Sequence, residues 1–213
     1  ADDTFSGQID DNTAANDTFN LTDTISGGAG TDTLSLTALD YADNAALTVA
    51  SVSGFEILTL RAADGSATTD DIIVTATNFP GLTTFNNDRS TSNVQITAMA
   101  AGTSVNVLGN GSLTNADTTA AYDATVTTGT LNFKGGVTAG AVALNGTGLT
   151  TVAIGSSGAN NVVGAVTTNS AVVTAVTIAA EKALTVASLG IGGTTAASLT
   201  ISGAAADVAA TST

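Results

Sequence analysis

The chain of 213 residues contains no cysteine, no histidine and no tryptophan, and it has a single proline. Without cysteine there are no disulfides, so a protein outside the reducing cytosol needs another source of stability, of which a bound metal is one. Zinc is a poor candidate because its preferred ligands are cysteine and histidine. Calcium remains available, since it binds carboxylate and carbonyl oxygens.

Charged and aromatic residues are also scarce, at 10% and 4% of the chain. Hydrophobic residues nevertheless make up 43%, so the chain has enough apolar surface to bury a core. Threonine, serine, asparagine and glycine must cover most of the surface in place of lysine and glutamate. The abundance of threonine and valine favours strands over helices.

Negative charge dominates and is concentrated at one end. The net charge is −14, and the first 71 residues contain 13 of the 18 acidic side chains with Arg61 as their only base. This sign excludes nucleic-acid binding, which requires a basic surface. Self-repulsion among the acids would be relieved by bound cations.

No apolar run is long enough for membrane insertion. The chain starts at Ala1, which predicts a processed product or a fragment of a longer protein.

Short β-prone segments recur from residue 57 onward, with about ten to fifteen residues between their centres and no helical pattern between them. Glycine, asparagine or serine follows most of them, as turns require. A sandwich of this size would need more aromatic residues in its core. We therefore expect an all-β fold, a right-handed parallel β-helix (β-solenoid) of roughly five to eight coils. Its strands are predicted within 57–60, 71–77, 82–85, 93–98, 103–109, 124–129, 130–133, 141–146, 149–155, 160–166, 172–178, 183–189 and 198–203. Its corners are predicted at Asn106, Asn110, Asn145, Asn160 and Asn161.

A glycine- and aspartate-rich turn stands out in the acidic region. Residues 27–35, GGAGTDTLS, fit the calcium-binding nonapeptide G-G-x-G-x-D-x-U-x, with Leu34 at the large apolar position. Glycines leave their carbonyl oxygens uncovered, and Asp32 adds a carboxylate. One such turn supplies about half of the six to eight oxygens that calcium takes, so a neighbouring turn must supply the others. The preceding nine residues, 18–26, end in the same pattern but lack the glycines.

Four short motifs occur in a fixed order over the first 90 residues: ADDTFSG (1–7), LTDTISGGAGTDTLSL (21–36), VSGFEILTLRA (52–62) and FPGLTTFNND (79–88). This series resembles the repeat organisation of RTX-type bacterial surface-layer (S-layer) proteins of the RsaA kind. The other 120 or so residues agree with that family only in being rich in threonine, valine and alanine. A dense C-terminal array of nonapeptides, typical of the family, is absent from this chain.

The resemblance implies type I secretion, a bacterial cell-surface location outside the cell, and calcium-dependent self-assembly into a lattice. It implies an acidic, β-roll-like calcium-binding region over 1–60 and a β-solenoid over 61–213, with one continuous domain as the alternative. Surface polysaccharide is a further candidate partner. Carried over by position, the calcium ligands are Asp3, Asp23, Gly28, Gly30, Asp32 and Glu56, with the glycines binding through their carbonyls.

Other interpretations remain open for individual residues and for the whole chain. Glu56 either is a ligand or occupies a solvated strand position, and Asp10, Asp11 and Asp17 are solvated or bound. An extracellular calcium-stabilised adhesin or binding module is the alternative function. A β-helical polysaccharide-active enzyme needs an acid pair or a base beside calcium. No such constellation is visible in the predicted solenoid, so we do not expect an enzyme.

Overall fold

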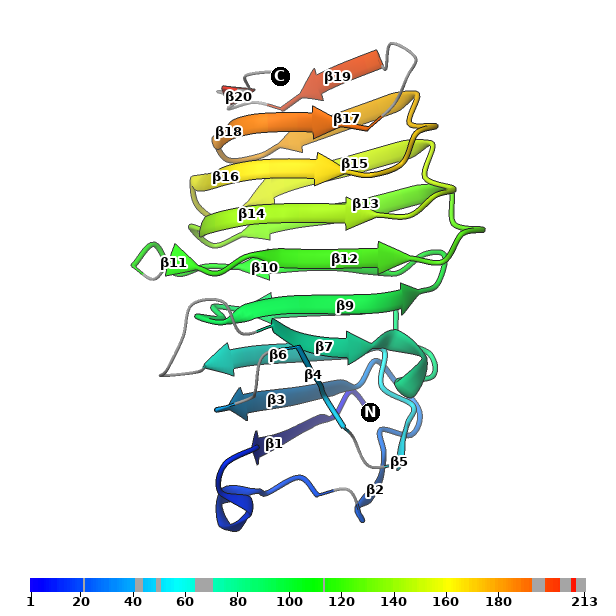
Figure 1. Ribbon diagram of the computed structural model, residues 1–213, viewed down its shortest axis with the longest axis vertical. Helices are drawn as coiled ribbons and strands as arrows, with labels where there is room; N and C mark the ends of the chain where they lie inside the picture. The colour runs from blue at the N-terminus through cyan, green and yellow to red at the C-terminus, as the bar shows by residue number, and fades with distance from the viewer. Residues whose placement is uncertain are drawn as a thin grey trace.

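The computed structural model describes residues 1–20, 22–40, 44–48, 51–63, 71–112, 114–192, 198–203 and 208–209. Over these residues the protein is all-β, and its parallel strands stack into a β-solenoid of about seven turns (Figure 1). Strand β1, with β2 and the chain that joins them, lies at one end of the long axis, and strands β19 and β20 lie at the other. The solenoid predicted from the sequence is confirmed.

One face of the solenoid is a nine-stranded parallel sheet, which we call the first sheet. It runs through the acidic N-terminal region and the rest of the chain without a break. Its strands, in spatial order, are β1 (Thr4–Asp10), β3 (Thr33–Leu39), β6 (Ile57–Ala63), β8 (Thr84–Asp88), β10 (Ser104–Leu108), β13 (Thr128–Lys134), β15 (Thr151–Ser157), β17 (Ala175–Ala180) and β19 (Ser198–Ser202).

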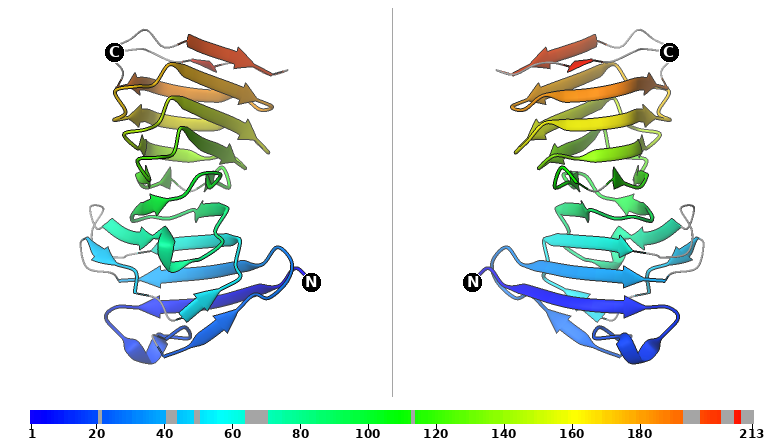
Figure 2. Two further views of the ribbon diagram at one scale, coloured as in Figure 1. Left: turned by 90° about the vertical axis from the view of Figure 1, so that its right-hand side faces the viewer. Right: turned by 90° about the vertical axis from the view of Figure 1, so that its left-hand side faces the viewer.

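The second sheet packs against the first, and the coils stack along the long axis with the N-terminal ones widest (Figure 2). Its strands are β4 (Ala45–Ala46), β7 (Asp71–Thr75), β9 (Asn93–Met99), β12 (Thr118–Tyr122), β14 (Thr138–Asn145), β16 (Asn161–Thr168), β18 (Leu184–Ile191) and β20 (Val208–Ala209), with β11 (Thr114–Asn115) beside β14. A small sheet joins β2 (Thr24–Ser26) to β5 (Ser51–Ser53). Two 3-10 turns, η1 (Ala14–Asn16) and η2 (Ala76–Asn78), complete the elements.

The core is built from columns of apolar side chains, one per coil. Alternate residues of a strand point to opposite faces, and in-register pairing places like positions above one another. The central column of the first sheet, which we call the inner column, is completely buried in its interior. Its members are Phe5, Leu34, Leu58, Phe85, Val105, Leu131, Ile154, Ile178 and Ile201.

The outward face of the first sheet carries a ladder of amide hydrogen bonds. Asn132 Nδ2 donates to Asn106 Oδ1 at 2.9 Å, and Asn106 Nδ2 donates to Asn86 Oδ1 at 2.7 Å. Asn86 Nδ2 ends the ladder on Thr59 Oγ1 at 3.0 Å. The expectation that Asn106 occupies a corner is therefore wrong, because it lies in the middle of β10. Its amide still bonds along the stack.

Asn161 does occupy a corner, at the start of β16. Its Oδ1 accepts the Val137 N–H at 2.8 Å, and its Nδ2 donates to Ser156 Oγ and to the Ala159 carbonyl, both at 2.9 Å. The side chain is 1% exposed, so these bonds satisfy polar groups that water does not reach. One predicted strand is also wrong: residues 124–127 form the turn before β13, with Val126 buried.

Candidate metal centre

The nonapeptide of the sequence analysis forms the turn between β2 and β3. Gly28 and Gly30 have φ values of +93° and +139°, which suit glycine. A Cβ on Gly27 would overlap the carbonyl oxygen of Gly54 and lie 2.6 Å from the Cβ of Asp32, so only glycine fits there. Leu34, at the apolar position, points into the core and is 1% exposed. The turn thus has the local geometry that its sequence indicates.

Three of the predicted ligands, Asp3, Asp32 and Glu56, form what we call the acid row. Each precedes a strand of the first sheet, and the pairing of Thr4, Thr33 and Ile57 brings them into register. The Asp3 N–H donates to Asp32 Oδ1 at 2.7 Å, and the Asp32 N–H donates to Glu56 Oε2 at 2.8 Å. Asp32 and Glu56 therefore each accept a main-chain hydrogen bond from the coil before them.

Asp32 is the most unusual member of the row. Its side chain is 0% exposed, and its second oxygen, Oδ2, has no hydrogen-bonding partner among the described residues. Burying a carboxylate oxygen without a donor or a cation is unfavourable by about 1–3 kcal/mol or more. This oxygen lies 2.9 Å from the position that a Gly27 Cβ would take, on the same side as the Gly54 carbonyl. Asp32 Oδ2 and the Gly54 carbonyl oxygen therefore both lie next to the position that a Gly27 Cβ would occupy.

Asp23 lies apart from the acid row. Its Oδ2 accepts the Asn20 N–H at 2.7 Å, and its carbonyl accepts the Ser51 N–H at 3.1 Å. The first bond closes a local turn before β2, and the second joins this turn to the start of β5. Asp2, which the sequence analysis did not single out, accepts the Thr31 N–H at 2.9 Å through Oδ1. It thereby ties the N-terminus to the glycine turn.

The oxygen atoms around the glycine turn are of the chemical type that calcium binds, but few of them belong to carboxylates. Among the described residues, no three acidic, histidine or cysteine side chains are arranged to hold a metal. The unpartnered oxygen of Asp32 and the Gly54 carbonyl are oxygen ligands of the kind that calcium prefers. Main-chain oxygens of the glycine turn and water would have to supply the other positions. The sequence analysis did not single out Gly54, because it took only Glu56 as a ligand from the motif VSGFEILTLRA that contains both.

A second acidic cluster closes the far end of β1. Asp10 is 5% exposed, and it accepts the Thr13 N–H at 2.9 Å and the Asn16 Nδ2 at 2.7 Å. Asp17 Oδ1 accepts the Asp10 N–H at 2.7 Å. The hydrogen bond from Asn16, together with those from main-chain N–H groups, lowers the pKa of Asp10. These contacts give Asp10 and Asp17 a structural role as a cap on the first coil.

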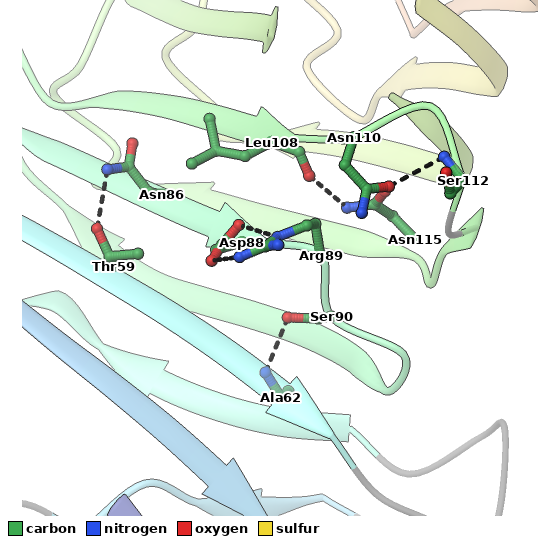
Figure 3. Close-up of polar contacts among 10 residues, drawn as sticks. All are labelled: Thr59, Ala62, Asn86, Asp88, Arg89, Ser90, Leu108, Asn110, Ser112 and Asn115. Atoms are coloured by element: carbon green, nitrogen blue, oxygen red, sulfur yellow. Dashed lines mark hydrogen bonds and ion pairs between the residues drawn. The ribbon is translucent and has the colours of Figure 1, made fainter. Parts of the chain in front are cut away.

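The four basic side chains lie in or just beyond the C-terminal halves of first-sheet strands. Arg61 lies two residues before the end of β6 and Lys134 ends β13, while Arg89 follows β8 and Lys182 follows β17. Arg89 pairs with Asp88 through two bonds, Nε to Oδ1 at 2.7 Å and Nη2 to Oδ2 at 2.8 Å (Figure 3). Beside them Ser90 Oγ accepts the Ala62 N–H at 2.9 Å. No basic side chain approaches the acid row from this edge, because the row lies at the opposite ends of the strands.

Comparison with known proteins gives no match: no family model, no curated protein and no solved structure is similar to the chain. In the described part of the chain, no helix has the length and apolar character needed to cross a membrane. The functional argument therefore depends on this chain's own residues.

Proposed function

We propose that the protein is a calcium-dependent structural component of a bacterial cell-surface layer that self-assembles outside the cell. The observation that carries the proposal is the buried, unpartnered Oδ2 of Asp32 beside the glycine turn. A calcium ion would supply the missing partner for this oxygen and offset the repulsion along the acid row. Calcium would be held by Asp32 and by main-chain oxygens that include Gly54.

The acid row links the ion to the architecture. Asp32 accepts a hydrogen bond from Asp3 in the first coil and donates one to Glu56 in the third. An ion at Asp32 therefore stabilises three coils together. A protein whose end coils are rigid only when calcium is bound has a simple means of assembling outside the cell, where calcium is abundant.

The proposal is tested by sedimentation velocity and negative-stain imaging, at millimolar calcium and again after chelation. We expect sheets or filaments with calcium and their loss on chelation. Asp32→Asn should raise the calcium concentration needed for assembly. Asp11→Asn is the matched control, because it removes the same charge from an exposed position in the same region.

Two results would oppose the proposal. Equal effects of Asp32→Asn and Asp11→Asn would show that general charge, rather than a site at Asp32, controls assembly. If the protein stays monomeric under both conditions but melts at a higher temperature with calcium, the result would support the metal site and oppose self-assembly. It would favour the alternative function, a calcium-stabilised adhesin or binding module, with surface polysaccharide as a candidate partner.

A further inference from the structure

A pocket of about 290 Å³, which we call the corner pocket, lies at the edge of the solenoid where β7, β9 and β12 end. Residues within 76–82 and 98–103 line it, together with Asp123 directly after β12. The arrows of these three strands point to the same side in Figure 1. The acid row lies on this edge as well, and the Thr83 N–H donates to the Glu56 carbonyl at 2.9 Å.

The corner pocket combines an apolar lining with one carboxylate. Ala76, Phe79 and Leu82 line it and are at most 9% exposed. Asp123 lines the same pocket and is exposed, and its N–H donates to the Met99 carbonyl at 3.0 Å, which fixes its main chain. Among the described residues, no hydrogen bond or ion pair reaches its carboxylate. The pocket therefore presents an unpaired negative charge beside apolar surface.

A bulge in β9 borders the corner pocket. Ala120 pairs with Ile96 but Tyr122 pairs with Met99, so β9 has one residue more than β12 at this point. Ala98, which lines the pocket, has a φ of +55°, a left-handed conformation that is unfavourable for a residue with a Cβ. Strained backbone of this kind is concentrated at functional sites. The strain marks the pocket as a candidate binding surface.

A lysine side chain matches this combination of apolar lining and carboxylate. Its methylene groups can pack against apolar surface while its ammonium group stays at the water boundary. There the ammonium group would be attracted by the carboxylate of Asp123. The corner pocket therefore fits a lysine that a partner presents.

The chain has such a lysine on the opposite edge of the solenoid. Among the four basic side chains, Arg89 is already in an ion pair, and the Nε of Arg61 is buried. Lys182 directly follows Glu181 in the sequence, which places an acid beside it. Lys134 is exposed, and no acidic side chain of the described residues forms an ion pair with it. Lys134 is therefore the basic side chain most available to a partner.

Asp123 and Lys134 belong to the same coil. Asp123 follows β12, and Lys134 ends β13, the next strand, so they lie at opposite edges. Their heights along the long axis are similar, because one coil rises by only about 4.8 Å. The Gly109 N–H donates to the Lys134 carbonyl at 2.9 Å, and β11, which follows Gly109, stands out from the stack in Figure 1. One edge of this coil is hollow, and the other protrudes.

We propose that a second copy of this chain lies beside the first, with Lys134 of one copy in the corner pocket of the next and its ammonium group against Asp123. A sideways shift without rotation brings the two residues together, because their heights are similar. Each copy then retains a free corner pocket on one edge and a free Lys134 on the other. Contacts of this kind do not close, so they extend into rows.

This inference rests on the self-assembly proposed above and names the surface that it uses. The contact does not include Asp32, so the two proposals can fail separately. Chelation tests the metal, whereas charge changes at the two edges test the contact between copies.

The experiment reverses each charge and measures the weight-average mass by analytical ultracentrifugation as concentration rises, at millimolar calcium. Asp123→Lys and Lys134→Glu should each raise the apparent dissociation constant of self-association by at least about tenfold, because like charges then meet in the contact. An equimolar mixture of the two variants should assemble like the wild type. In the mixture, the new lysine of one variant meets the new glutamate of the other.

The controls change the net charge by the same amounts away from the contact. Lys182→Glu matches Lys134→Glu, and Asp11→Lys matches Asp123→Lys; both should assemble like the wild type. Circular dichroism checks the fold of each variant. Asp123→Asn and Lys134→Gln replace a reversal that does not fold, and they should weaken assembly in the same direction.

Two results would overturn the contact while leaving self-assembly intact. One is a wild type that assembles together with reversal variants that assemble equally well. The other is a pair of variants that are blocked singly and stay blocked when mixed. A wild type that remains monomeric at all concentrations, with and without calcium, would overturn the contact and the self-assembly together.

Discussion

One inward-facing register position distinguishes the two halves of the solenoid. In the N-terminal coils the residue before each first-sheet strand is Asp3, Asp32 or Glu56. At the same register the C-terminal coils have Val152 and Val176, which are 1% and 2% exposed. Valines at this position fill space and need no partner, whereas a buried carboxylate needs a donor or a cation. From this difference we expect only the stability of the N-terminal coils to depend on calcium.

The largest effect is expected from making a C-terminal coil resemble an N-terminal one. Val176→Asp places a carboxylate in an apolar column with no glycine turn beside it, and it should lower the free energy of unfolding by about 3–5 kcal/mol. Urea denaturation measures the loss, which calcium should not restore. Thr177→Asp, one residue farther on and facing outward, is the control and should cost little.

A smaller effect is expected within the glycine turn. Gly27→Ala should cost about 2–3 kcal/mol, because the added Cβ meets the Gly54 carbonyl and the backbone must move. Gly28→Ala has open space around the new Cβ, and its positive φ should cost only about 1 kcal/mol. Equal losses in the two variants, measured by urea denaturation, would contradict the close packing of the turn against Gly54.

The amide ladder tests the middle of the molecule. Asn106→Ala removes two hydrogen bonds, one to Asn86 and one from Asn132, and leaves their partners partly exposed to water. We expect a loss of about 1–2 kcal/mol that does not change with calcium. Ser104→Ala, on the outward face of the same strand, is the control. A loss that calcium reverses would mean that the two halves are not separate in their metal dependence.

The smallest expected effect is the loss of stability at low pH that follows from protonation of Asp10. Hydrogen bonds lower the pKa of Asp10 below its ordinary value of 3.8, so the ionised form is stabilised by folding. That stabilisation is present above the unfolded-state pKa and is lost as the pH falls through the lower folded-state value. Unfolding measured between pH 5 and about pH 2 should therefore show a steeper loss in the wild type than in Asp10→Asn. Asp11→Asn should follow the wild type.

The sequence predicts the class of fold because each coil repeats the same alternation of small apolar and polar residues. It does not predict the register, because the coils differ in length. Phe5 pairs with Leu34, 29 positions later, whereas Phe85 pairs with Val105, 20 positions later. Without a constant period the position of Asn106 in mid-strand could not be found. Residues 124–127 look β-prone because Val126 is apolar, yet it fills a corner.

The candidate site was predicted in part for the same reason. The nonapeptide marks the glycine turn and Asp32, and these local features are present. The alignment of Asp3, Asp32 and Glu56 depends on stacking between coils, which local motifs specify only when their spacing is regular. Asp23 matches the motif pattern but lies apart, in a turn before the separate β2 and β5 pair. The Gly54 carbonyl borders the same space, but from the motif that contains it only Glu56 was taken as a ligand.

The most direct test of the account is calcium-dependent stability of the wild type compared with Asp32→Asn, measured by urea denaturation with calcium and with chelator. At a calcium concentration a hundredfold above the dissociation constant, the wild type should gain about 2.7 kcal/mol. Asp32→Asn should gain far less, while Asp11→Asn should match the wild type. An equal gain in Asp32→Asn and the wild type, or no gain in either, would contradict a calcium site at Asp32.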